Sequence, residues 1–102
     1  MPLDNFIASI ESEWEPETGF FWKIRQGDFR EEDFSRAVEK FAAVPAIAGQ
    51  LVPARLVSVL WYVPIFMEWQ TNRVREQGCS MAAYAAATTR LLNEVERILG
   101  VP

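Results

Sequence analysis

The chain has 102 residues, of which 50% are apolar and 13% aromatic, and its 14 acidic and 10 basic side chains give a net charge of −4. This length suits one domain over residues 1–102, and the apolar content is high enough to form a folded core. The single cysteine excludes a disulfide within the chain, and without histidine a zinc site would lack its usual ligands. We therefore expect neither a metal nor a cofactor.

The N-terminal part of the chain predicts one helix and a short second one. Apolar side chains recur with helical spacing at Phe6, Ile7, Ile10 and Trp14. Asp4 is placed to cap the start of this helix, and the proline and glycine of residues 15–19 end it. A short helical segment over residues 20–26 then ends at Gly27, a residue suited to the left-handed position after a helix.

A further helix is expected after the Gly27 turn. Asp28 and Glu31 have the three-residue spacing of a capping pair. The apolar face of this helix consists of Phe34, Ala37, Val38 and Phe41. Pro45 ends the helix, and residues 46–52 form a connection.

A long apolar segment, residues 53–77, is expected to form the centre of the fold. Pro53 suits the first helical position, whereas Pro64 removes a backbone hydrogen bond and should kink or break the helix. Ser80 is expected to cap a final helix, which Gly100 closes. Its apolar face contains Tyr84, Leu91, Val95 and Ile98. The sequence thus predicts an all-α, single-domain bundle of four to five helices with a proline-kinked central helix.

The most apolar run, residues 56–67, is too short to cross a membrane. As a helix it would span about 18 Å, whereas the hydrocarbon core of a bilayer is about 30 Å thick. We therefore expect a buried core helix and no membrane contact. The first residues, 1–4, show no basic or apolar region typical of a signal peptide, so a cytoplasmic location is expected.

Groups that usually carry catalysis at neutral pH are scarce in this chain. Histidine is absent, and no base can be named for Cys79, for which we expect a packing role. Glu68 is unusual because apolar residues flank it. Its carboxylate either points to solvent, pairs with an arginine such as Arg36 or Arg73, or is buried and used in binding. The chain contains no phosphate-binding or dinucleotide motif, and we expect that it is not an enzyme.

The four tryptophans fall into two groups. Trp22, Trp61 and Trp69 lie in segments of apolar periodicity, and core packing is expected for each. Trp14 is flanked by acids on both sides, and tryptophan anchors are frequent at the centres of interfaces.

The excess negative charge lies in residues 1–22, which contain no basic residue. A second acidic group follows Gly27, where its charge also suits a helix N-terminus. Each group is either an ordinary solvated face or an anionic surface that attracts a basic protein and repels nucleic acid. The candidate partner-binding residues are Glu11, Glu13, Trp14, Glu15, Glu17, Asp28, Glu31, Glu32 and Asp33.

Two aromatic segments carry a family resemblance. Residues 19–29 read GFFWKIRQGDF and precede an acidic amphipathic helix, and residues 60–70 read LWYVPIFMEWQ. Together they resemble small α-helical immunity proteins of bacterial contact-dependent growth inhibition and polymorphic toxin systems. The resemblance implies that the chain binds and neutralises the toxin domain of a secreted effector, and a basic nuclease would suit its acidity. The alternative is a small helical structural or adaptor subunit that acts through protein–protein contacts. We expect a monomer or a weak homo-oligomer.

Overall fold

A computed structural model describes residues 3–102, and all regular structure within this range is helical. The elements are α1 (Asp4–Glu11), the 3-10 turn η1 (Ser12–Trp14), α2 (Phe20–Arg25), α3 (Glu31–Ala42), α4 (Ala54–Trp69), α5 (Thr71–Glu76) and α6 (Met81–Leu99). The all-α prediction is confirmed. The described residues form six α-helices, where four to five were expected, and α2 and α5 are only 6 residues long.

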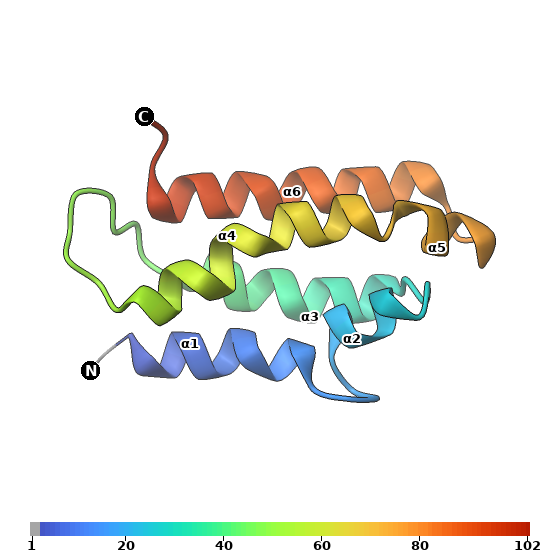
Figure 1. The fold of residues 1–102 in the computed structure, drawn as a ribbon, viewed down its shortest axis with the longest axis horizontal. Coiled ribbons are helices and arrows are strands. Elements are labelled where there is room, and N and C mark those ends of the chain that lie inside the picture. Colours follow the sequence, from blue (N-terminus) through green and yellow to red (C-terminus); the bar gives the residue numbers. More distant parts are fainter. Residues whose placement is uncertain (1–2) are drawn as a thin grey trace.

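The four longer helices run roughly along the long axis of the molecule, and α2 and α5 lie together at one end (Figure 1). Helix α4 packs against both α6 and α1. Helix α3 packs against the same two helices. None of the helices in residues 3–102 is long and apolar enough to cross a membrane.

The core is built around one side of α4. Its inward residues are Leu56, Leu60, Val63, Phe66 and Met67, all at most 1% exposed. Phe66 meets an aromatic group from α2 and η1, because its ring lies 5.9 Å from that of Phe21 and 4.7 Å from that of Trp14. Burying one such side chain stabilises a fold by roughly 1.5–3 kcal/mol, so α4 organises the packing of its neighbours.

Local signals placed some helix ends correctly. Gly27 has a φ of 80° after α2, and the Oγ of Ser80 accepts a hydrogen bond from the Ala83 N–H at 3.2 Å. Two predicted caps were wrong. Leu3 occupies the capping position of α1 and Asp4 lies in its first turn, where a negative charge still favours the helix dipole. Arg30 occupies the capping position of α3, and no side chain caps this helix.

The central segment contains two helices. Helix α4 continues through Pro64, and the division falls at Gln70, where the backbone has φ −90° and ψ 0°. Pro53 occupies the capping position of α4 and Ala54 begins the helix. The helices therefore separate at Gln70 and not at Pro64, so a break at Pro64 was wrongly predicted. A kink at Pro64 stays a prediction. Buried residues on both sides of Pro64 hold the helix in place despite the missing N–H.

Candidate functional site

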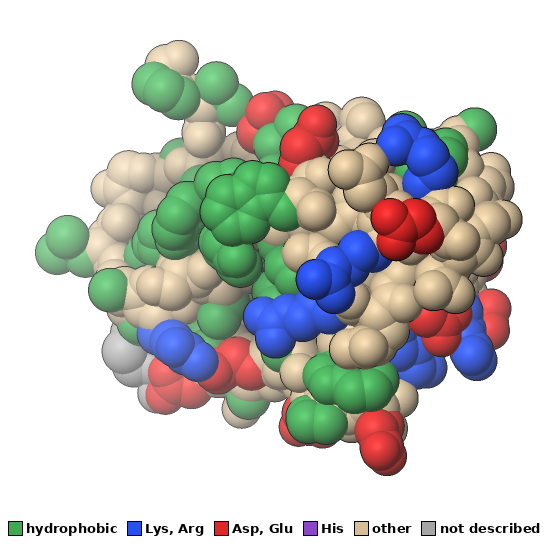
Figure 2. Space-filling view, turned by 45° about the vertical axis from the view of Figure 1, so that its right-hand side comes forward, with side chains coloured by type: hydrophobic (Ala, Val, Ile, Leu, Met, Phe, Trp, Pro, Cys, Tyr) green, Lys and Arg blue, Asp and Glu red, His purple; other side chains and the backbone are tan. Residues whose placement is uncertain are grey.

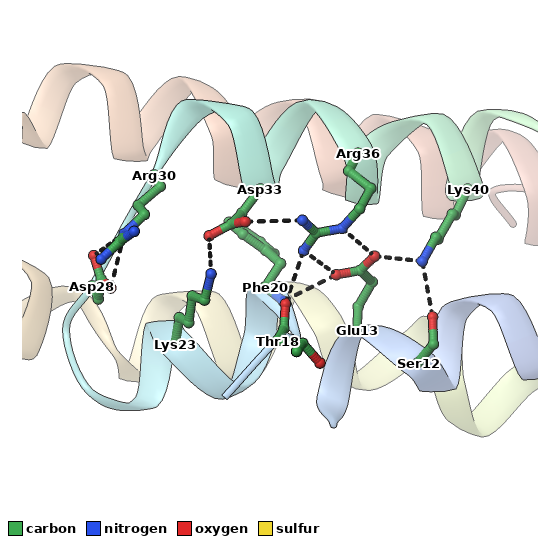
Figure 3. A network of polar contacts seen from close by, with 10 residues as sticks. All are labelled: Ser12, Glu13, Thr18, Phe20, Lys23, Asp28, Arg30, Asp33, Arg36 and Lys40. Carbon is green, nitrogen blue, oxygen red and sulfur yellow. Dashed lines mark hydrogen bonds and ion pairs between the residues drawn. The ribbon is translucent and has the colours of Figure 1, made fainter. Parts of the chain in front are cut away.

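Glu13 is a buried carboxylate at the centre of a partly buried ion-pair network (Figure 3). Its side chain is 1% exposed. One carboxylate oxygen, Oε1, accepts hydrogen bonds from Arg36 Nη2 at 2.7 Å and from the Phe20 N–H at 3.0 Å. The other, Oε2, accepts from Lys40 Nζ at 2.6 Å and from Arg36 Nε at 2.9 Å. Both oxygens are therefore bonded within the protein.

These contacts set the charge state of Glu13. Burial raises its pKa, but the hydrogen bonds from Arg36, Lys40 and the Phe20 N–H outweigh burial and lower the pKa from 4.5 to about 2. The carboxylate is therefore ionised at neutral pH, and its charge is matched by two cations from α3.

Asp33 extends the same network into α2. It is 4% exposed and accepts hydrogen bonds from Lys23 Nζ at 3.0 Å and from Arg36 Nη1 at 2.9 Å. Arg36 thus bridges the two buried carboxylates. Because Glu13 and Asp33 are buried and bonded internally, they join η1, α2 and α3, and we leave them out of any proposed partner surface.

Two further candidate acids have partners at the surface. Glu11 pairs with Arg55 at the start of α4, and Asp28 pairs with Arg30 at 3.0 Å. Exposed pairs of this kind contribute little to stability, about 0–1 kcal/mol. They do partly neutralise both carboxylates, so these residues contribute less to an anionic surface than their number suggests.

Four of the predicted acids remain exposed and form no ion pair within the part of the chain that the structure describes. They are Glu15, Glu17, Glu31 and Glu32. The first two lie in the turn before α2 and the others in the first turn of α3. Arg36 of α3 links the two segments, because it donates to the Thr18 carbonyl at 3.2 Å.

Trp14 packs against aromatic side chains and a basic one. Its ring stacks on Phe21 at 4.6 Å, and the Arg25 guanidinium lies 5.3 Å from its centre. It forms part of an open groove of about 300 Å³ whose other lining residues are Glu11, Arg25, Arg55, Ser58, Val59 and Tyr62. The predicted anchor therefore faces a groove beside α4.

An exposed aromatic surface on α4 was not expected from the sequence. Trp61 is 51% exposed and Trp69 is 68% exposed, so the prediction of core packing was wrong for both, whereas Trp22 is half-buried. Figure 2 shows exposed hydrophobic side chains gathered beside basic ones on one face of the molecule. The sequence alone did not show this, because α4 is apolar around most of its circumference and its pattern does not single out the covered side.

Glu68 and Cys79 have ordinary environments. Glu68 is exposed, which confirms the reading in which it points to solvent, while Arg73 donates instead to the Arg25 carbonyl at 2.9 Å. The Cys79 sulfur is half-buried, 3.6 Å from the Gly27 carbonyl oxygen. Within residues 3–102, no group of three or more acidic or cysteine side chains is placed to hold a metal ion.

Comparison with known proteins identifies no relative of this chain. No family model matches the chain, and no curated protein or solved structure matches it either. Its surfaces are therefore interpreted from its own residues.

Proposed function

We propose that the chain acts in the bacterial cytoplasm as an immunity protein that binds and neutralises a cognate toxin domain of nuclease type. The observation that carries this proposal is the set of four exposed carboxylates without an ion pair in residues 3–102, Glu15, Glu17, Glu31 and Glu32. The family resemblance of residues 19–29 and 60–70 points to the same function.

Electrostatic complementarity supports this choice of partner. A nuclease must attract phosphate groups, so its active-site groove is positively charged. An acidic surface competes for the same groove and raises the association rate through long-range attraction.

The arrangement of Arg36 favours rapid and tight binding. From α3 it donates to the Thr18 carbonyl, and this bond ties the turn that carries Glu15 and Glu17 to α3 before any partner arrives. Side chains on a restrained backbone lose less entropy on binding than those on a flexible one. The buried network thus supports the surface, although Glu13 itself cannot reach a partner.

The test uses the toxin domain encoded beside the gene of this chain. Co-expression should protect cells from that domain, and the two proteins should purify together. A chain that neither protects cells nor binds the domain is not its immunity protein, and the absence of any neighbouring effector gene would remove the basis of the proposal.

Charge reversal tests the acidic surface separately. The double variants Glu15→Lys with Glu17→Lys, and Glu31→Lys with Glu32→Lys, should each slow association about tenfold or more at low salt. The matched control is Glu76→Lys with Glu96→Lys, two exposed acids elsewhere with the same change of charge. If test and control variants slow association equally, the toxin binds through another surface while the immunity function stands.

The alternative function, a structural or adaptor subunit, is favoured by one observation. Trp61 and Trp69 expose large apolar surfaces on α4, as expected for a helix that a further protein covers. This alternative would be favoured if the chain did not protect cells from the toxin domain but assembled stably into a larger complex.

A further inference from the structure

The outer face of α4 carries a row of large apolar side chains that the other helices of residues 3–102 leave exposed or only partly covered. Val57, Trp61, Ile65 and Trp69 follow one another at intervals of four residues. Val57 is 37% exposed, Trp61 51% and Trp69 68%, and Ile65 is half-buried. Side chains four residues apart form a continuous ridge along a helix, which we call the α4 ridge.

A ridge of this kind matches the surface of another helix. In the commonest class of helix packing, the four-residue ridges of two helices interlock. Tryptophan is also enriched at the centres of protein interfaces, because it buries a large area and loses little side-chain entropy. The α4 ridge therefore has the shape and composition of a helix–helix contact.

One flank of the ridge carries an unpaired cation. The Arg25 guanidinium lies 5.3 Å from the ring centre of Trp14 and 5.5 Å from that of Phe66, beside Tyr62 in the groove described above. Among the basic side chains of residues 3–102, it is the one whose guanidinium or ammonium group makes no hydrogen bond. The two rings hold it in place with its N–H donors available.

The opposite flank carries an unpaired anion. Glu68 lies one residue before Trp69, on the side of α4 that faces α6, where it borders a groove with Met81 and Tyr84. Its carboxylate has no hydrogen bond or ion pair within the described residues. A positive group and a negative group therefore lie on opposite sides of the same apolar ridge.

This arrangement is complementary to itself. A two-fold axis along the ridge brings the α2 flank of one copy against the α6 flank of the other. Arg25 of each copy then faces Glu68 of the partner subunit, and the two ridges interlock between them. We propose that a second copy of this chain docks on the α4 ridge, with reciprocal ion pairs between Arg25 and Glu68.

The size of the ridge sets the expected strength of the dimer. Four side chains from each copy give an interface near or below about 1,000 Å², the small end of specific contacts. Such a dimer should be weak and reversible, with a dissociation constant of about 10–100 µM. The inference does not depend on a toxin, because the acidic surface at Glu15, Glu17, Glu31 and Glu32 uses other residues.

Sedimentation equilibrium of the whole chain tests the dimer directly. Between about 5 and 500 µM, the average mass should rise from that of one copy towards that of two. Trp61→Ser and Trp69→Ser should each weaken the dimer about tenfold or more, whereas Leu92→Ser, at a 37% exposed position on α6, should leave it unchanged. Circular dichroism confirms that each variant is folded.

Charge exchange tests the proposed pairing. Arg25→Glu and Glu68→Arg should each weaken the dimer, because each places like charges opposite one another. An equal mixture of the two variants should recover a mixed dimer, since opposite charges then meet at both contacts. Glu96→Arg serves as the control for the change of net charge.

Three results would overturn the inference. The first is a chain that stays monomeric over the whole concentration range. This includes the case in which Trp61 becomes buried only when a toxin domain is added. The second is a dimer that survives Trp61→Ser and Trp69→Ser. The third is failure of the mixed variants to recover, which would reject the Arg25–Glu68 pairing even if a dimer forms.

Discussion

Arg36 Nη2 lies 2.7 Å from Glu13 Oε1, although 23 residues separate the two in the chain. This bond joins α3 to η1, and the same guanidinium also bonds the Thr18 carbonyl and the Asp33 carboxylate. One arginine of α3 therefore holds η1 and the acidic turn that follows it against α3. The proposed partner surface depends on this internal contact. The contribution of the contact to the stability of the fold is measurable without any partner.

Replacement of Glu13 should destabilise the fold. Glu13→Ala removes the acceptor of Arg36, Lys40 and the Phe20 N–H, and should lower the free energy of unfolding by about 3 kcal/mol. Urea denaturation measures this loss. Glu15→Ala, at an exposed position two residues away, should change it by no more than about 0.5 kcal/mol. Equal effects of the two variants would contradict the central role of Glu13.

Stability should fall in acid. The pKa of Glu13 in the folded protein is about 2, below its usual 4.5, so ionised Glu13 stabilises the fold above about pH 4.5. This stabilisation, about 3 kcal/mol for such a shift, is lost as the pH falls from 4.5 towards 2. Asp33 adds in the same direction, because the hydrogen bonds from Lys23 and Arg36 outweigh burial and lower its pKa.

Urea denaturation at pH 7 and at pH 3 measures this dependence. Glu13→Gln should show a smaller loss of stability between the two values than the unaltered chain, since glutamine does not titrate. Glu15→Gln provides the control and should behave like the unaltered chain. An unchanged acid dependence in Glu13→Gln would assign the effect to other carboxylates.

Gly27 allows a steric test of the contact between α2 and α5. A Cβ at this position would lie 2.5 Å from the Arg73 carbonyl oxygen, and the backbone has a φ of +80°. Gly49 has a similar φ of +78° with nothing within 4 Å of such a Cβ. Gly49→Ala should therefore lower the free energy of unfolding by about 1 kcal/mol, through the strain of a left-handed backbone alone. Gly27→Ala should lower it by about 2 kcal/mol or more, because the added Cβ also meets the Arg73 carbonyl. Thermal unfolding compares the two, and equal losses would show that the Arg73 contact is not restrictive.

The Tyr84 hydroxyl should stabilise the end of α4. It is buried and donates a hydrogen bond to the Met67 carbonyl at 2.6 Å, which joins α6 to α4. Tyr84→Phe should lower the free energy of unfolding by about 1 kcal/mol in urea denaturation. Tyr62→Phe, whose hydroxyl makes no hydrogen bond within residues 3–102, should have a smaller effect. The reverse order would contradict this role of Tyr84.

Local rules predicted the features that depend on near neighbours. Helical periodicity identified the helices around Ile10, Phe41 and Ile98, and residue type identified the turn at Gly27 and the cap at Ser80. These features are set within a few residues by backbone geometry and nearby hydrogen bonds. The division at Gln70 escaped prediction because no glycine or proline marks it.

Only the tertiary structure decided which side chains lie inside. Glu13 and Glu15 are both acids of one segment, yet Glu13 alone reaches Arg36 and Lys40, which come from more than 20 residues away. Conversely, Trp61 and Trp69 lie on a helix that is apolar all round, so its composition could not show which side the neighbouring helices cover. The sequence by itself therefore determined the all-helical class and the surplus of acidic and aromatic groups. The packing of distant segments decided which of these groups form the core and which remain at the surface.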